Sequence, residues 1–202
     1  MNALSRLFAV LLISSLAGTA ALAQQQRPDQ LVKSTTEEVL AVIKKTNDRA
    51  TLRKIAQQKV LPYFDFTEMT RLAVGRPWRE ATPEQKKKLQ AEFTDLLVNT
   101  YTSALTRTVA ADKTVEVKPL QAGANDKDVT VRSVVKGGGG QPLEIDYRMS
   151  KEDQGWKVID VIVENVSLVT TYRGSFAQEV QQGGIDGLIK SLEGKNRQLA
   201  KG

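Results

Sequence analysis

The most restrictive feature of this sequence is a change in its apolar period at about Thr114. Before that point, apolar residues recur every three or four positions, and after it they alternate with polar ones. The first pattern is typical of amphipathic helices, and the second is typical of half-buried strands. Helices followed by strands predict an α+β fold in which the helices lie on one side of an antiparallel sheet.

Start and stop signals divide the helical half into segments. We expect a first helix to begin at Ser34, which forms a capping box with Glu37, and a second to cover about 51–60. A third, short helix is predicted to begin at Asp65, with Glu68 as its capping partner, and to end at Gly75.

The longest predicted helix has the clearest start. Thr82 is its expected N-cap, Pro83 its first residue and Gln85 the partner of Thr82. An apolar stripe then recurs every four residues for several turns, which indicates one buried face. The stripe consists of Leu89, Phe93, Leu97, Tyr101 and Leu105.

Four strand-like runs follow, at 114–120, 129–136, 143–149 and 156–164. The gaps between them carry glycine and polar turn residues, which predict an antiparallel meander of four strands. The last run is apolar on both faces apart from Asp160, as expected for a strand covered on two sides. A closing helix is predicted over 168–192, with a break near Gly183 and Gly184.

The first 23 residues have the pattern of an export signal. Arg6 precedes an apolar run at 7–13, and small residues lead to Ala23, where we expect cleavage. The run is shorter than the about 20 residues of a membrane span, although an uncleaved anchor is the alternative. No cysteine follows, so a lipid-modified N-terminus is not expected. We therefore predict a polar tether at 24–33, one domain at 34–196 and a tail at 197–202.

Two absences restrict the chemistry of the chain. It contains no histidine and no cysteine, so a Ser-His triad, a thiolate nucleophile and the common zinc sites are excluded. Its net charge of +6 is spread along the chain, unlike the clustered basic face of a nucleic-acid-binding protein. Mild basicity suits an approach to anionic lipid headgroups, and ordinary solubility explains it equally well.

Several segments together resemble one known family. They are residues 75–79 (Gly-Arg-Pro-Trp-Arg), 82–85 and 156–169, followed by Thr171-Tyr172-Arg173 and by 184–189. Their order over 34–196 is similar to that of the MlaC, or toluene-tolerance, family of periplasmic phospholipid-binding proteins. Asn165 stands where the family pattern has glycine, and a left-handed backbone there tolerates asparagine.

The resemblance implies an NTF2-like curved sheet that encloses a deep apolar cavity for phospholipid acyl chains. It implies a monomeric carrier without a cofactor, which moves lipid in the periplasm and maintains outer-membrane lipid asymmetry. Its expected partners are an inner-membrane ABC transporter complex with an MCE-domain ring and an outer-membrane lipoprotein–porin complex. No nucleic acid is expected.

Candidate lining residues come from the long helix, the last two strands of the meander and the closing helix. They are Phe93, Leu97, Tyr101, Tyr147, Val161, Val163, Leu168, Tyr172 and Phe176. For each, plain core packing is the alternative. We place Arg173 at the mouth, unless it pairs with an acidic residue such as Asp160. Trp78 is interpreted as a structural residue that packs the 75–79 corner onto the long helix.

Two other functions remain open at this point. Asp160 lies inside an apolar strand, and a buried carboxylate could serve an NTF2-like enzyme. Without a histidine to act as a base partner, a salt bridge or a hydrogen bond to the backbone is the simpler interpretation. The other possibility is an adaptor without a lipid cavity, whose helical faces bind proteins.

Overall fold

A computed structural model describes residues 26–46, 48–108, 113–121, 123, 126–137 and 139–201. The helical half contains α1 (Pro28–Ile43), α2 (Arg49–Ile55), α3 (Phe66–Val74) and α4 (Pro83–Thr108). Short helical turns join them: η1 (Ala56–Val60), η2 (Leu61–Tyr63) and η3 (Arg76–Arg79). The strands are β1 (Thr114–Val117), β2 (Asp128–Lys136), β3 (Leu143–Glu152), β4 (Gly155–Val163) and β5 (Val166–Ser167), and α5 (Leu168–Lys201) closes the chain. The predicted signal peptide at 1–23 lies outside the described residues.

The sheet is an antiparallel meander in the order β1-β2-β3-β4-β5, so the α+β prediction is confirmed. The expected number of four strands is wrong, because Val166 and Ser167 pair back onto β4 as a fifth. Two residues are too few to give an alternating pattern in the sequence. The turn before them contains Glu164 and Asn165, both with positive φ (49° and 64°), which confirms the left-handed backbone expected at Asn165.

One face of the sheet is apolar, as the alternation predicted. Directly paired residues share a face, and Tyr147 is paired with both Val131 and Val161. The register shifts between Arg148 and Met149, where β4 carries one extra residue. Such a bulge bends a strand and increases its twist, so the sheet curves at this point.

The first helix begins earlier than predicted. Pro28 is its first residue, and the hydroxyl of Ser34 donates to the carbonyl of Leu31 inside the helix, so the expected cap at Ser34 is wrong. Leu31 and Val32 are buried, and Asp29 accepts a hydrogen bond from the amide of Leu120 at 3.1 Å. These tertiary contacts hold residues 28–33 in the first helix, although the sequence predicted them to be part of a polar tether.

The other caps follow the sequence closely. Thr82 and Gln85 exchange both hydrogen bonds of the capping box, at 3.0 and 3.2 Å. Asp65 accepts from the amide of Glu68, and α3 ends at Gly75 with φ of 71°. Glu68 is not the return partner of Asp65, because its carboxylate binds Arg71 and the Asp65 amide donates to the carbonyl of Val158.

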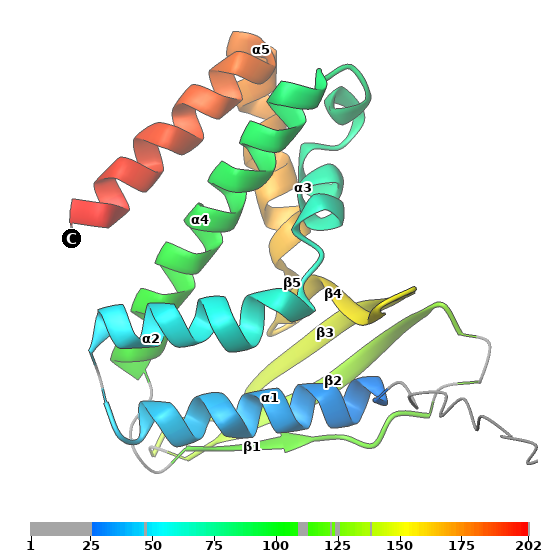
Figure 1. Ribbon diagram of the computed structural model, residues 1–202, viewed down its shortest axis with the longest axis vertical. Coiled ribbons are helices and arrows are strands. Elements are labelled where there is room, and N and C mark those ends of the chain that lie inside the picture. Colours follow the sequence, from blue (N-terminus) through cyan, green and yellow to red (C-terminus); the bar gives the residue numbers. More distant parts are fainter. Residues whose placement is uncertain are drawn as a thin grey trace, which may run out of the picture.

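The closing helix is bent where the sequence indicated. Gly184 has non-helical angles (φ 65°, ψ −168°) and separates two arms of α5. In Figure 1 the first arm rises from β5 and the second returns along α4, with which α5 makes extensive contact. The second arm continues to Lys201, so the residues predicted as a tail are mostly helical.

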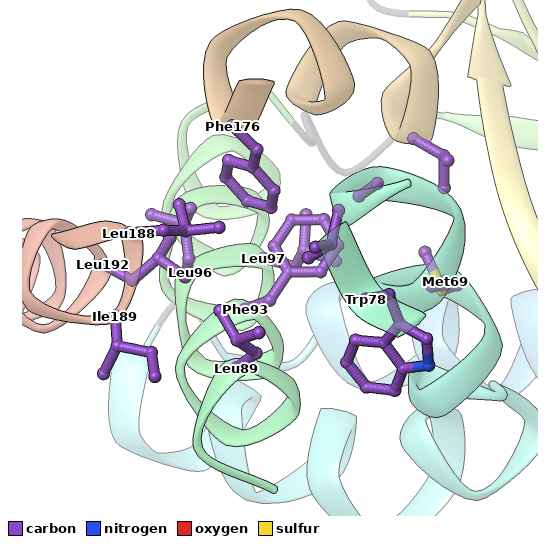
Figure 2. Close-up of a cluster of buried hydrophobic side chains, with 13 residues drawn as sticks. Met69, Trp78, Leu89, Phe93, Leu96, Leu97, Phe176, Leu188, Ile189 and Leu192 are labelled. Carbon is purple, nitrogen blue, oxygen red and sulfur yellow. The ribbon is translucent and has the colours of Figure 1, made fainter. Parts of the chain in front are cut away.

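Two separate groups of buried apolar side chains hold the fold. The helical cluster joins α3, η3, α4 and α5 (Figure 2) and consists of Met69, Ala73, Val74, Trp78, Leu89, Phe93, Leu96, Leu97, Val169, Phe176, Leu188, Ile189 and Leu192. The sheet cluster joins α1 to the apolar face and consists of Leu31, Val32, Val131, Met149 and Val158. Trp78 is buried in the helical cluster, which confirms its structural role.

Candidate functional site

The candidate site is the region in which the two clusters meet. Its sheet side is formed by Tyr147, Val161 and Val163, which the strand register places on the apolar face. All three are half-buried. Tyr147 and Val161 pack against the sheet cluster, and Phe64 packs against both clusters. These side chains therefore keep accessible apolar surface while they remain attached to a rigid sheet.

The hydroxyl group of Tyr147 is a polar point on this apolar face. Burial raises the pKa of Tyr147, and hydrogen bonding with Ser133 and Thr36 acts in the opposite direction. Ser133 lies on β2 and Thr36 on α1, so the phenol reaches toward the contact between the helix and the sheet. Neither partner was identified from the sequence, although Ser133 interrupts an otherwise apolar alternation.

The helical side of the site is formed by Tyr101 on α4 and by Leu168 and Tyr172 on α5, all half-buried. The two tyrosines pack against the helical cluster. Burial raises the pKa of Tyr101 to about 12, and proximity to Tyr172 adds to the shift. Burial also raises the pKa of Tyr172, although a hydrogen bond with Thr100 acts to lower it.

The remaining three candidates lie deeper. Phe93 and Phe176 are 0% exposed and Leu97 is 6% exposed, all within the helical cluster. The Phe93 ring meets those of Tyr172 and Phe176 edge to face, with centroids 5.0 and 5.2 Å apart. Figure 2 shows Phe93 and Phe176 pointing toward one another between α4 and α5. These three residues therefore belong to the buried core between the helices, and the half-buried ring of Tyr172 packs against Phe93 and Phe176.

Arg173 lies beside a group of other arginines. It lines an open cleft of about 360 Å³ with Arg71, Leu72, Gly75, Arg76 and Arg79. Its guanidinium lies close to the backbone of Gly75, where a Cβ atom would be 3.3 Å from Nε. The alternative pairing of Arg173 with Asp160 is wrong. Arg148 on the neighbouring strand occupies that position, with Nη1 3.8 Å from Oδ2.

Asp160 is fully engaged in structural contacts. It is 1% exposed, and its carboxylate accepts from the Ser167 hydroxyl at 2.6 Å and from the Val169 amide at 3.2 Å. These bonds tie β4 to the start of α5, as the simpler interpretation of Asp160 predicted. In the described part of the chain, no group of carboxylates could hold a metal ion.

The cleft residues Arg76 and Arg79 were not predicted as site residues, because the 75–79 segment was interpreted only through Trp78 and the family resemblance. Their spacing contained the missing signal. In a 3₁₀ turn, residues three apart are eclipsed, so arginines at 76 and 79 fall on one side when the segment adopts that turn.

Within the described residues, none of the helices has the length and apolar content needed to cross a lipid bilayer.

Comparison with known proteins places these features in one family. The family model described as "MlaC protein" matches residues 33–194. The toluene tolerance protein ttg2D of Pseudomonas putida is 28% identical over 182 residues, covering 87% of this chain and 83% of that protein. The intermembrane phospholipid transport system binding protein MlaC of Haemophilus influenzae is 21% identical over 145 residues, covering 70% and 67%.

A solved structure is also similar over most of the chain. The phospholipid-binding protein from Ralstonia solanacearum, determined in complex with a phospholipid, is 38% identical. It superposes with a TM-score of 0.79, covering 87% of this chain and 99% of that one. Because the family model spans most of the sequence and a solved relative shares the fold, this chain belongs to the MlaC family.

Proposed function

We propose that this protein is a soluble periplasmic carrier that binds phospholipid acyl chains between the apolar sheet face and the helices. The observation that carries the proposal is the likeness to the Ralstonia solanacearum protein, whose structure contains a phospholipid. The relative from Haemophilus influenzae is named as the binding protein of an intermembrane phospholipid transport system. The first relative supports phospholipid binding, and the name of the second supports a role in moving lipid between membranes.

The physical problem of such transport favours an internal pocket. Each buried methylene contributes about 0.8 kcal/mol, so two acyl chains with about 30 methylenes would lose about 24 kcal/mol on exposure to water. A carrier avoids this cost by transferring the chains from one apolar environment directly to another. It needs no catalytic group, which agrees with a chain without histidine or cysteine.

The half-buried residues are the best-placed lining of this pocket. Tyr147, Val161 and Val163 would form its sheet wall, and Tyr101, Leu168 and Tyr172 its helical wall. Phe93, Leu97 and Phe176 would contact lipid only if the helices separated, since they are buried in the helical cluster. The position of Arg173 at the mouth stays a prediction.

In this proposal the carrier works between an outer-membrane lipoprotein–porin complex and an inner-membrane ABC transporter with an MCE-domain ring. Its transport would maintain the lipid asymmetry of the outer membrane. It would act as a monomer with phospholipid as its ligand and without a further cofactor. The enzyme alternative based on Asp160 loses its support, because the carboxylate accepts hydrogen bonds from Ser167 and Val169 and forms an ion pair with Arg148.

Organic extraction of the purified protein, followed by mass spectrometry, tests the proposal. We expect phospholipid in stoichiometric amount, and delipidated protein should take up lipid from vesicles. Protein that repeatedly lacks phospholipid and acquires none from vesicles would refute the carrier function. That result would leave the adaptor function as the remaining candidate.

A matched pair of variants tests the location of the pocket. Val163→Gln adds a polar group to the apolar face, and Val134→Gln adds the same group to the opposite face, where Val134 pairs with Glu116 and Glu144. Both valines are half-buried strand residues. We expect Val163→Gln to reduce lipid uptake while both variants stay folded by circular dichroism. Equal lipid uptake by the two variants would show that the pocket lies elsewhere.

A further inference from the structure

The arginine cleft contains more positive charge than the fold itself neutralises. Arg71, Arg76, Arg79 and Arg173 line it together with Leu72 and Gly75. Arg71 pairs with Glu68. Within the described part of the chain, the other three arginines make no ion pair with a carboxylate. The cleft is therefore left with a net excess of three positive charges.

Three separate elements hold these side chains in place. Trp78 is buried in the helical cluster and fixes η3, and the three-residue period of that turn directs Arg76 and Arg79 to one side. Gly75 has a positive φ and no side chain, which allows the guanidinium of Arg173 to lie against its backbone. Arginines from α3, η3 and α5 thus converge on a preformed concave surface.

Like charges at close range repel one another, so this arrangement costs stability unless an anion completes it. Guanidinium groups bind carboxylates through paired, charge-assisted hydrogen bonds. We propose that the cleft is a docking site for carboxylate side chains of an acidic segment on a protein partner.

The shape and position of the cleft favour a protein over a membrane as the occupant. A planar bilayer surface cannot enter a concave space of about 360 Å³, whereas one or two acidic side chains fit it. Leu72 offers an apolar contact beside the charges, which a peptide chain can use. Arg173 follows Tyr172, so a partner docked here would lie against the part of α5 that forms the proposed pocket wall. This last step rests on the proposed carrier function.

Binding of a hexaglutamate peptide, measured by isothermal titration calorimetry, tests the docking site. The variant Arg76→Gln/Arg79→Gln removes two charges from the cleft. The control Lys44→Gln/Lys45→Gln removes two exposed charges at the far end of α1. We expect the cleft variant to weaken binding by at least about tenfold, because charge-assisted contacts are lost. The control should change it by less than about twofold, and high salt should weaken wild-type binding.

Two further probes separate the possible occupants. Equal peptide binding by the cleft and control variants would refute the proposal. It would also be refuted if the peptide did not bind, while anionic phosphatidylglycerol vesicles or inorganic phosphate did. That binding would have to depend on Arg76 and Arg79, so that it is lost in the cleft variant. The melting temperature of the cleft variant should stay the same or rise, since removing repelling charges does not weaken the fold.

Lipid content distinguishes a failure of docking from a failure of the carrier function. The cleft variant should retain phospholipid as the wild type does. A protein that binds the peptide but contains no lipid would keep the docking site and lose the carrier function. A protein that carries lipid but binds no peptide would give the reverse result.

Discussion

Replacing Asp160 with asparagine should destabilise the protein without removing its ability to bind lipid. The carboxylate is 1% exposed and uses one oxygen for the Val169 amide and the other for the Ser167 hydroxyl. Ser167 in turn accepts from the amide of Thr170 at 3.0 Å and so caps α5. The change therefore acts on the junction through which the sheet positions the closing helix.

The magnitude follows from the groups that lose a partner. Asparagine offers a single acceptor oxygen, so one of the two donors is left facing an NH₂ group. Losing a hydrogen bond to a charged group costs about 1.5–3 kcal/mol, and a buried donor without a partner costs a similar amount. Arg148 is half-exposed (46%) and regains water, so its 3.8 Å contact adds less than about 1 kcal/mol. We expect a loss of about 3 kcal/mol in the free energy of unfolding.

Thermal unfolding of delipidated protein measures this loss, because bound ligand would itself raise the melting temperature. For a chain of this size, about 3 kcal/mol corresponds to a decrease of about 6–12 °C. Asp146→Asn is the control, since its one ion pair among the described residues is a 3.9 Å contact with the exposed Arg132. A melting temperature equal to that of the control would refute the structural role of Asp160. Loss of lipid uptake at unchanged stability would bring back a functional role.

Two more outcomes follow from the aromatic groups around the site. Phe93→Ala should lower the free energy of unfolding by about 3–5 kcal/mol, because it removes a fully buried ring and its contacts with Tyr172 and Phe176. Urea unfolding measures this loss. A value below about 1 kcal/mol would show that the helical cluster is not rigid there. Burial raises the pKa of Tyr101 to about 12 and also raises that of Tyr147 and Tyr172. Because the unfolded chain releases these protons first, near pH 10, stability should be full below that pH and fall between about pH 10 and 12. Ultraviolet titration at 295 nm should show tyrosines that ionise only as the protein unfolds, and a simple titration of every tyrosine near pH 10 in folded protein would contradict this.

The sequence predicted best where the local signals and the tertiary contacts agree. The capping box of Thr82 and Gln85, the break at Gly184 and the left-handed Asn165 depend on residues next to each other in the chain. The apolar alternation of β3 likewise fixed which side chains share a face with Tyr147. In each case the fold adopts the conformation that the neighbouring residues in the chain favour.

The errors arose where a distant partner decided the structure. Ser34 has the composition of a helix cap, but burial of Leu31 and Val32 against the sheet extends α1 past it. Glu68 is placed to complete a cap, but the amide it would bind is taken by β4. Arg148 reaches Asp160 through a strand pairing that brings residues 12 positions apart side by side. The sequence around each residue does not show that a distant group will bind it in place of the local partner.

The same limit explains the uneven outcome for the candidate site. Apolar residues at helical or strand spacing were expected to face a pocket, but periodicity cannot distinguish a wall from the core behind it. The structure separates them by depth. Phe93, Leu97 and Phe176 are enclosed, whereas Tyr101, Val163 and Leu168 keep accessible surface. Only the second kind can gain contacts from a ligand without first losing contacts with the protein.

This division gives the proposed carrier a physical basis for releasing its cargo. The helical cluster and the sheet cluster are each packed within themselves, with Phe64 in contact with both. Acyl chains that enter between them would add apolar contacts to the half-buried side chains and leave both clusters intact. The empty protein would then keep its fold, since neither cluster depends on lipid to be complete. A carrier built in this way can deliver lipid without unfolding.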